Sequence, residues 1–295
     1  MLKMKVKLAR NALGFLEVEN KPSLTELRNY YAEKYFQEAK GSYRHSYTKD
    51  ELEYFRVKVD QRARAVRRIR PKVGRFLDVG CGEGMALAYF RESGWEVEGI
   101  DFSDAGINAI NPQLRDAVET GEIMSLLSQR IARGEVYDLV WLTNVLEHVL
   151  DAPALLTALH ALVSEAGVLS VTVPNDFSDL QQMLLKRGCV EDEFWVAFPD
   201  HLSYFDRESL DCTARSCGWT PRVFLADFPI DLFLLHSGSN YVRDRDQGPL
   251  AHRARVSFEL FLNSRNIDEV NAFYESMAAV GLGRNITAIL TKRAA

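Results

Sequence analysis

Three glycines at alternate positions, Gly80, Gly82 and Gly84, are the residues whose spacing most clearly indicates chemistry. They follow an apolar run that ends at Val79 and precede a helix-like segment. Because glycine has no Cβ, the backbone of such a turn can adopt positive φ and approach a ligand closely. Asp101 ends the next apolar run, and its carboxylate can accept hydrogen bonds from both hydroxyl groups of a ribose. The pattern therefore predicts a site for a ribose-containing cofactor.

The glycine spacing distinguishes two classes of cofactor. A dinucleotide-binding turn has the pattern GxGxxG, and counted from Gly80 its third glycine would fall at Met85. The sequence has GxGxG instead, with Asp78 before it. This pattern resembles motif I of the class I S-adenosylmethionine (SAM)-dependent methyltransferases. The resemblance implies that SAM binds here and leaves as S-adenosylhomocysteine (SAH), with Asp78 and loop amides orienting the ammonium group. An NAD-dependent oxidoreductase is the alternative that the spacing disfavours.

The resemblance extends over roughly residues 70–175. Segments 136–149 and 166–175 look like the motifs around the fourth and fifth strands of that family. The match implies that Asn144, which follows the fourth strand, lies in the cofactor site. It also implies that Phe102 packs on the adenine ring and that Glu122 lies near the adenine amine.

Two histidines could serve the reaction that this family performs. Methyl transfer requires a nucleophile aligned with the sulfonium methyl group, and a base within hydrogen-bond reach can take its proton. His148 follows the fourth strand and His201 follows the fifth, so both lie at the edge where ligands bind. The alternative for each is a structural histidine that is bonded to nearby backbone. Glu147 could orient His148 or be solvated. Asn144 stands where a metal-assisted mechanism needs an acidic ligand, so we expect no metal.

Apolar runs of strand length alternate with helical segments from Arg75 onwards. Such alternation predicts an α/β fold with a parallel, doubly wound sheet. The resemblance implies a Rossmann-like sheet of seven strands whose last strand is antiparallel, with a helical insert at about residues 229–283. We expect strands at residues 75–79, 95–100, 137–143, 167–173, 222–226 and 285–291, and helices at 85–93, 104–110, 152–164 and 207–216.

The first 70 residues are expected to form a hairpin and helical cap, or lid, on a methyltransferase domain at 71–295. Alternation at residues 3–8 and a second run at 15–18 predict the hairpin. Thr48 and Glu51 form a capping-box pair before a periodic helix that Pro71 ends. Six aromatic residues between hairpin and helix either pack the cap or line a ligand pocket. They are Tyr30, Tyr31, Tyr35, Phe36, Tyr43 and Tyr47.

Composition limits the class of protein and its partners. The chain has 295 residues, of which 47% are hydrophobic and 26% charged, which is typical of a folded globular protein. A net charge of −5 argues against a nucleic-acid partner. No apolar run is long enough to span a membrane, and the four cysteines have no CxxC spacing. We therefore expect a cytoplasmic protein without disulfides.

The sequence says least about the methyl acceptor. The N-terminal segment and the Arg284-Asn285 ending resemble uncharacterised methyltransferases associated with bacterial surface-polysaccharide genes. We therefore expect O-methylation of a sugar in a glycan or nucleotide-sugar. The basic residues of the insert would suit the phosphates of a nucleotide-sugar. The alternatives are a quinone-like or other small phenol, held in an apolar pocket of Phe228, Phe233 and Trp195, and a non-catalytic SAM-binding protein. A homodimer is also expected.

Overall fold

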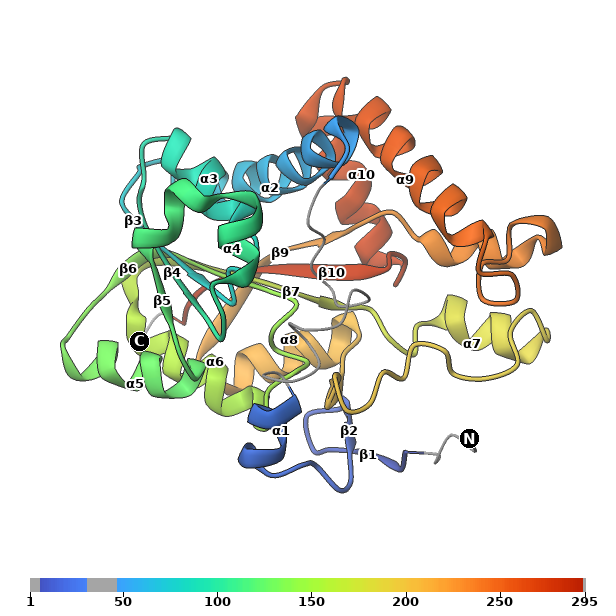
Figure 1. Cartoon of the computed structure of the whole chain (residues 1–295), viewed down its shortest axis with the longest axis horizontal. Helices are drawn as coiled ribbons and strands as arrows, with labels where there is room; N and C mark the ends of the chain where they lie inside the picture. The colour runs from blue at the N-terminus through green and yellow to red at the C-terminus, as the bar shows by residue number, and fades with distance from the viewer. Residues whose placement is uncertain (1–5, 31–46, 294–295) are drawn as a thin grey trace.

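The computed structural model describes residues 6–30 and 47–293, and a seven-stranded sheet forms its centre (Figure 1). The strand order is β5-β4-β3-β6-β7-β10-β9. The strands are β3 (Arg75–Val79), β4 (Glu96–Asp101), β5 (Val118–Thr120), β6 (Tyr137–Thr143), β7 (Val163–Pro174), β9 (Trp219–Ala226) and β10 (Asn285–Lys292).

Strand directions in the sheet confirm the expected fold class. Strands β3, β4, β5, β6 and β7 pair in parallel, whereas β10 is antiparallel to both of its neighbours, β7 and β9. The order reverses between β3 and β6. In an open α/β sheet, ligands bind outside the carboxyl ends of the strands at such a switch point.

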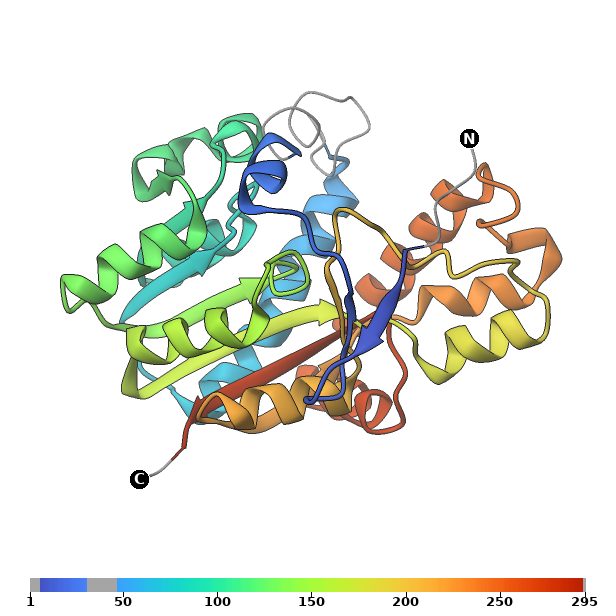
Figure 2. The same ribbon diagram turned by 90° about the horizontal axis from the view of Figure 1, so that it is seen from below.

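Helices cover both faces of the sheet (Figures 1 and 2). Helices α2, α3 and α10 lie on one face, where α2 contacts both of the others. Helices α5, α6 and α8 pack in a row on the opposite face. The helices are α1 (Leu24–Tyr30), α2 (Lys49–Ile69), α3 (Met85–Glu92), α4 (Ala105–Ile110), α5 (Ile123–Ala132), α6 (Ala152–Leu162), α7 (Asp179–Lys186), α8 (Arg207–Ser216), α9 (Gln247–Asn263) and α10 (Ile267–Ala279). Short 3-10 turns occupy η2 (Pro112–Ala117), η3 (Ile230–Leu235) and η4 (Ser237–Ser239).

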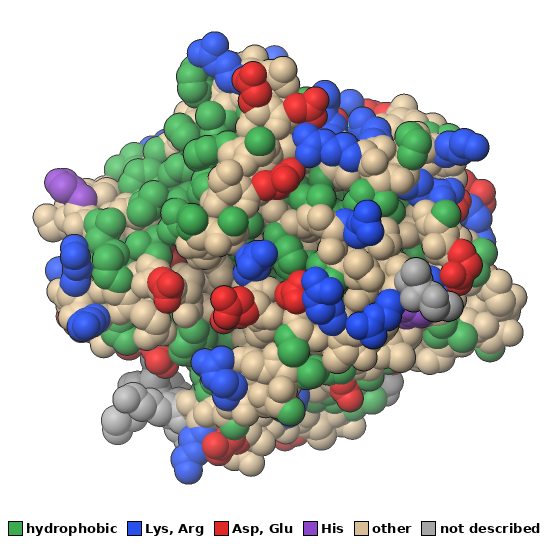
Figure 3. Space-filling view, turned by 180° about the vertical axis from the view of Figure 1, so that it is seen from behind, with side chains coloured by type: hydrophobic (Ala, Val, Ile, Leu, Met, Phe, Trp, Pro, Cys, Tyr) green, Lys and Arg blue, Asp and Glu red, His purple; other side chains and the backbone are tan. Residues whose placement is uncertain are grey.

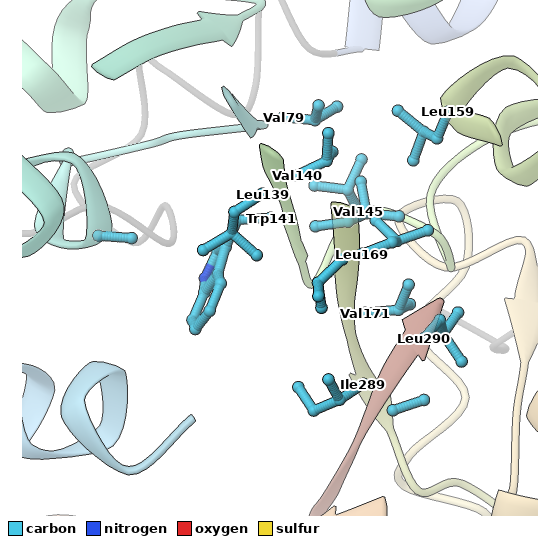
Figure 4. Close-up of a cluster of buried hydrophobic side chains, with 14 of the residues drawn as sticks. Val79, Leu139, Val140, Trp141, Val145, Leu159, Leu169, Val171, Ile289 and Leu290 are labelled. Carbon is cyan, nitrogen blue, oxygen red and sulfur yellow. The ribbon is translucent and has the colours of Figure 1, made fainter. Parts of the chain in front are cut away.

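The core lies between the central strands and these two helical layers. Leu139, Val140 and Trp141 of β6 are almost completely buried, and they meet Leu169 of β7 and Ile289 of β10 in one apolar cluster (Figure 4). Parallel strands that are covered on both faces need such continuous apolar runs. The cluster fixes the strand ends that carry the candidate site.

Helix α2 begins and ends where its sequence predicts. The Thr48 hydroxyl accepts the amide of Glu51, and the Glu51 carboxylate accepts the amide of Thr48 at 2.9 Å, so both halves of the capping box form. The helix ends at Ile69, two residues before Pro71. It packs on α3, α10 and β7, and therefore lies directly on the sheet.

The N-terminal hairpin forms and joins a distant part of the chain. Strands β1 (Leu8–Arg10) and β2 (Leu16–Val18) are antiparallel, and β8 (Ser203–Tyr204) pairs with β2 as a third strand. The first strand lies later than the expected residues 3–8, of which 3–5 lie outside the described residues. The hairpin lies on the same side of the sheet as α8 (Figure 2).

Most of the aromatic cluster of the expected cap lies outside the described residues, namely Tyr31, Tyr35, Phe36 and Tyr43. Tyr47 lies within them, and its hydroxyl donates to the carboxylate of Glu83 at 2.5 Å, which links this segment to the glycine loop. The division between a cap at 1–70 and a domain at 71–295 stays a prediction.

Several boundaries differ from the expected ones for local reasons. Helix α6 ends at Leu162 rather than residue 164, because Val163 already pairs with Tyr137 as the start of β7. Strand β9 begins at Trp219 rather than Arg222. The insert at 229–283 is helical as expected and contains α9 and α10.

Within the described part of the chain, no helix is both long and apolar enough to cross a membrane. Large apolar side chains nevertheless remain exposed on the insert, where α9 carries Phe258 and Phe261 and α10 carries Phe273. Hydrophobic side chains gather on one part of the face seen from behind (Figure 3).

Candidate active site

The turn after β3 has the backbone that its glycines predict. Gly80, Gly82 and Gly84 have φ values of 73°, 52° and 73°. A Cβ at Gly80 would lie 2.3 Å from a methyl carbon of Val145, and a Cβ at Gly84 would lie 2.2 Å from Ile107. Both conformation and space therefore require glycine at these two positions. Gly84 also serves as the N-cap of α3.

Asp101, at the end of β4, holds this turn in place. Its Oδ2 accepts the amide of Gly82 at 2.8 Å, and its Oδ1 accepts the amide of Ser103 at 3.1 Å. The side chain is buried, with an exposed fraction of 6%, and burial raises its pKa against the effect of these hydrogen bonds. A carboxylate oxygen can accept a second hydrogen bond, so this group can also receive a ribose hydroxyl.

A cavity of about 290 Å³ lies beside the glycine turn. Four of the predicted cofactor residues line it, namely Asp78, Gly80, Gly82 and Asn144. Asn144 has a φ of 53°, an uncommon conformation for a residue other than glycine, at the end of β6. Gly84, Asp101, Phe102 and Glu122 are not among its lining residues. The structure thus brings half of the predicted residues to one cavity.

Glu122 has a structural role that the sequence reasoning missed. It is the N-cap of α5, and its carboxylate accepts the amides of Met124 at 3.0 Å and Ser125 at 2.7 Å. Glutamate is not among the preferred N-cap residues, so the sequence offered no signal for this role. Phe102 is partly buried against the core next to Asp101. The adenine contacts expected for both residues stay predictions.

Asp78 is a strongly perturbed carboxyl group in this cavity. Its exposed fraction is 4%, and burial together with the negative charge of Asp101 raises its pKa to about 8, although Arg62 acts in the opposite direction. A buried carboxyl with this pKa is mostly protonated at neutral pH. A cationic group placed beside it would favour its ionised form.

We expect the affinity for SAH to rise between pH 6 and pH 8. Below pH 8, Asp78 must lose a proton before it can pair with the ammonium of the ligand, and this cost falls as the pH rises. The affinity should increase by up to about tenfold per pH unit. Calorimetric titration measures the effect, and Asp78→Asn should give a flatter profile. A flat profile in the unmodified protein would contradict the assigned role.

His148 and His201 lie against each other although they are far apart in the sequence. Their ring centroids are 4.9 Å apart in an edge-to-face arrangement. His148 Nδ1 donates to the backbone carbonyl of Asp200 at 2.7 Å, so His148 has the backbone bond of a structural histidine. His201 Nδ1 lies 3.9 Å from a carboxylate oxygen of Asp176. The two predicted catalytic residues therefore form one cluster.

The charges in this cluster shift the pKa values of the two imidazoles in opposite directions. Burial alone would lower the pKa of His148, but the Glu147 carboxylate and the bonds to Asp200 raise it to about 9. Burial, followed by the positive charge of His148, lowers the pKa of His201 to about 4. At neutral pH His148 is thus cationic, and His201 is neutral and has a free electron pair.

Glu147 completes the cluster and was underestimated from the sequence. Its exposed fraction is 1%, neither carboxylate oxygen has a hydrogen-bond partner, and burial raises its pKa to about 7. One ligand atom each from Glu147, His148 and His201 lie within 4.8 Å of one another. Two imidazoles and a carboxylate are a donor set that Zn²⁺ uses. The expectation of a metal-free reaction did not consider this set of residues, which therefore adds an alternative.

A second cavity, of about 300 Å³, adjoins the first at the ends of β6, β7, β9 and β10. The two cavities share the lining residues Phe55, Lys58, Arg62, Thr143 and Asn144. An acceptor in the second cavity would therefore lie next to a cofactor in the first.

The side chains proposed for an apolar acceptor pocket lie elsewhere. Phe228, Phe233 and Trp195 line neither cavity. Trp195 is buried against Phe177 and Phe194. His148 and His201 are also absent from both linings. The part of the acceptor site that these five residues were expected to form stays a prediction.

The sheet order, the antiparallel β10 and the glycine turn define a class I SAM-dependent methyltransferase. Residues 47–222, more than half of the chain, match the family described as a methyltransferase domain. The chain belongs to this family of methyltransferases, and this membership supports the predicted SAM-dependent enzyme with SAM as its cofactor.

Curated relatives match the chain over about half of their length or less. A ubiquinone biosynthesis O-methyltransferase of Rhodopseudomonas palustris is 32% identical over 101 residues, which cover 34% of this chain and 40% of the relative. One of Sinorhizobium fredii is 29% identical over 134 residues, which cover 44% of this chain and 54% of the relative. A crystal structure of a SAM-dependent methyltransferase from Archaeoglobus fulgidus has a TM-score of 0.52 at 17% identity. It covers 92% of this chain and the chain covers 100% of it, which supports the fold.

Proposed function

We propose that the chain transfers the methyl group of SAM to a hydroxyl group of a small, quinone-like or other phenolic acceptor. Both curated relatives described above are named for ubiquinone biosynthesis, and neither is named for a sugar or glycan. They favour the phenol over the sugar that the sequence resemblance first suggested.

The observation that carries the proposal is the junction of the two cavities at Thr143 and Asn144. SAM supplies an electrophilic methyl group on sulfur. The glycine turn and Asp78 would hold its amino acid part, and Asp101 would hold the ribose. A hydroxyl that enters from the second cavity can then approach this methyl group in line with the sulfur. Fixing both reactants in this way supplies much of the rate enhancement of such a displacement.

The oxygen–methyl bond forms as the methyl–sulfur bond breaks, and the acceptor hydroxyl loses its proton. We propose that this proton passes through a water molecule to His201, because the imidazole is neutral at neutral pH but lines neither cavity. The positive charge of His148, 4.9 Å away between ring centroids, would stabilise the negative charge that develops on the acceptor oxygen. Phe102 and Glu122 are proposed to contact the adenine.

One observation favours the second candidate, a sugar hydroxyl of a nucleotide-sugar. The second cavity is lined by Lys58, Arg62 and Arg255, which could bind phosphate oxygens. The third candidate, a non-catalytic SAM-binding protein, would bind the cofactor without turnover. We also propose a homodimer, because α9 and α10 carry exposed phenylalanines, which are enriched in subunit contacts.

Incubation with SAM labelled in the methyl group tests these candidates. We expect label in catechols or hydroquinones, detected by mass spectrometry, and none in nucleotide-sugars or glycans. Label in sugars alone would overturn the phenolic acceptor in favour of the second candidate. An absence of SAH formation with every acceptor, together with intact SAH binding, would favour the non-catalytic protein.

A further inference from the structure

We infer that the second cavity is an anion subsite, in which Arg62 and Arg255 bind a carboxylate or phosphate group of the methyl acceptor. This inference rests on the proposed methyl transfer and narrows its substrate class to acceptors that carry a negative charge beside the hydroxyl group.

Arg62 comes from the middle of α2 and lines both cavities. Its Nη1 donates to the hydroxyls of Thr143 at 3.1 Å and Thr172 at 3.0 Å, and its Nε donates to the carbonyl of Lys58. Its guanidinium lies over the ring of Trp141 at 4.8 Å. These contacts fix the plane of the group, but all of its partners are neutral.

No described carboxylate forms an ion pair with Arg62, and no described acceptor receives a hydrogen bond from its Nη2. Burial lowers the pKa of Arg62 to about 10, which still leaves it fully charged at neutral pH. A charge in such surroundings is costly unless an opposite charge approaches it. The free side of the guanidinium therefore offers two N–H groups to an anion.

Arg255 approaches the same cavity from α9, on the helical insert. Its guanidinium lies over the ring of Tyr54 at 5.5 Å, and its Nη2 contacts Nδ1 of His252 at 2.8 Å. Its Nε is buried without a hydrogen-bond partner. Like Arg62, it forms no ion pair with a carboxylate in the described parts of the chain. Two elements thus direct unpaired guanidinium groups to one space.

The other charged groups of the lining are already engaged. Lys58 pairs with the buried Glu259 at 3.0 Å. Asp227 accepts the amides of Arg284 at 2.8 Å and Asn285 at 2.7 Å, and the side-chain amide of Asn285 at 2.6 Å. Glu259 balances Lys58, and Asp227, which these neutral donors leave negatively charged, balances one of the two arginines, so the lining keeps an excess of positive charge.

Gln61 supplies an independent indication of a missing ligand. It lines the cavity with an exposed fraction of 1%, and its Oε1 accepts from Lys58 at 2.9 Å. This contact fixes the orientation of the amide, so Nε2 is the free end, and it is buried without a partner. Buried donors of this kind are rarely left unsatisfied. An oxyanion in the cavity is the kind of group that such a donor lacks.

The carboxylate of a phenolic acid and the diphosphate of a nucleotide-sugar share this oxyanion chemistry. A neutral phenol would leave the two guanidinium groups and the Gln61 amide unpaired, and the loss of such polar contacts discriminates strongly against an acceptor. The subsite would thus select acceptors by their anionic group. Thr143 and Asn144 would lie beside the hydroxyl group that is methylated.

Calorimetry of the protein saturated with SAH tests the subsite without requiring turnover. The probes are 3,4-dihydroxybenzoate, its neutral amide 3,4-dihydroxybenzamide, and UDP-glucose. We expect one of the two anions to bind at least about tenfold more tightly than the neutral amide, as the loss of a charge-assisted hydrogen bond implies. Tighter binding of the benzoate assigns a carboxylate, and tighter binding of UDP-glucose assigns a phosphate.

Variants of the two arginines then test whether these side chains bind the anion. Arg255→Gln should weaken the preferred anion at least about tenfold and leave the neutral amide and SAH within about twofold. Arg62→Gln should also weaken the anion, and because Arg62 lines both cavities its SAH affinity is measured in parallel. Arg253→Gln is the matched control, since Arg253 is exposed on the same helix and does not line the cavity.

The outcomes separate this subsite from the proposed function. Anion binding that depends on Arg255, without methylation of any probe, would support the subsite and count against the proposed methyl transfer to phenols. Equal binding of the anions and the amide, no measurable binding of any probe, or an unchanged Arg255→Gln variant would overturn the subsite even if a neutral phenol is methylated.

Discussion

Replacement of Asp101 by alanine is expected to weaken the binding of SAH by about a hundredfold or more. In the proposed site, the carboxylate would accept two hydrogen bonds from the ribose, and each charge-assisted bond contributes about 1.5–3 kcal/mol. The same side chain holds the amides of Gly82 and Ser103, so its loss also loosens the glycine turn. Titration calorimetry with SAH measures the effect.

A control must separate lost ligand contacts from a general loss of the fold. Asp104→Ala removes a nearby exposed carboxylate that pairs with Arg115 at 2.8 Å, and it should leave the SAH affinity unchanged. Asp101→Asn keeps the size of the side chain and should weaken binding less than alanine does. If Asp101→Ala remains folded in a thermal unfolding scan and binds SAH normally, the assigned cofactor site is wrong.

Removal of the His201 imidazole should lower turnover by about a hundredfold or more, because general-base catalysis contributes factors of this size. His201→Ala should change the SAH affinity by much less, since His201 does not line the cofactor cavity. His148→Ala is expected to act in the same direction, through the charge it places beside His201. Single-turnover rates and SAH titrations on the same preparations measure the two quantities.

His160→Ala serves as the control for this pair, because His160 lies on α6 against Trp219 and away from the cluster. Rescue of His201→Ala by added imidazole would support a proton-transfer role over a structural one. Unchanged turnover in both single variants would leave proximity and orientation as the mechanism, with solvent taking the proton.

A chelator extends this test to the Glu147, His148 and His201 donor set. We expect EDTA to leave the turnover of the unmodified enzyme intact, as the sequence expectation of a metal-free reaction requires. Inactivation by EDTA that Zn²⁺ reverses would instead assign the cluster to a metal ion.

Local patterns in the sequence are sufficient for much of the fold. The strand Tyr137–Thr143 and the helix Arg207–Ser216 match their expected limits, since both have clear periodicity and defined ends. The glycine turn is equally local, because its function depends on backbone conformation within five residues. Fold class and cofactor therefore follow from contiguous segments.

The acceptor site could not be predicted in the same way. Its cavity is built from α2, α9 and the ends of four strands, so the residues that meet there have no common spacing. In the sequence, Arg62 is one of several arginines on a helix. Only the packing of α2 on the sheet shows that Arg62 faces the cavity whereas Arg64 is exposed. The contact between His148 and His201 is likewise tertiary.

The small sheet of β1, β2 and β8 has a mechanical consequence. The amide of Val18 donates to the carbonyl of Leu202, next to His201, and Lys21 donates to the carbonyl of Leu150, two residues after His148. Residues 16–21 thus connect the two loops that carry these imidazoles through hydrogen bonds. A shift of either loop would have to stretch or break these hydrogen bonds. The spacing of the two histidines is therefore maintained by residues that have no chemical part in the reaction.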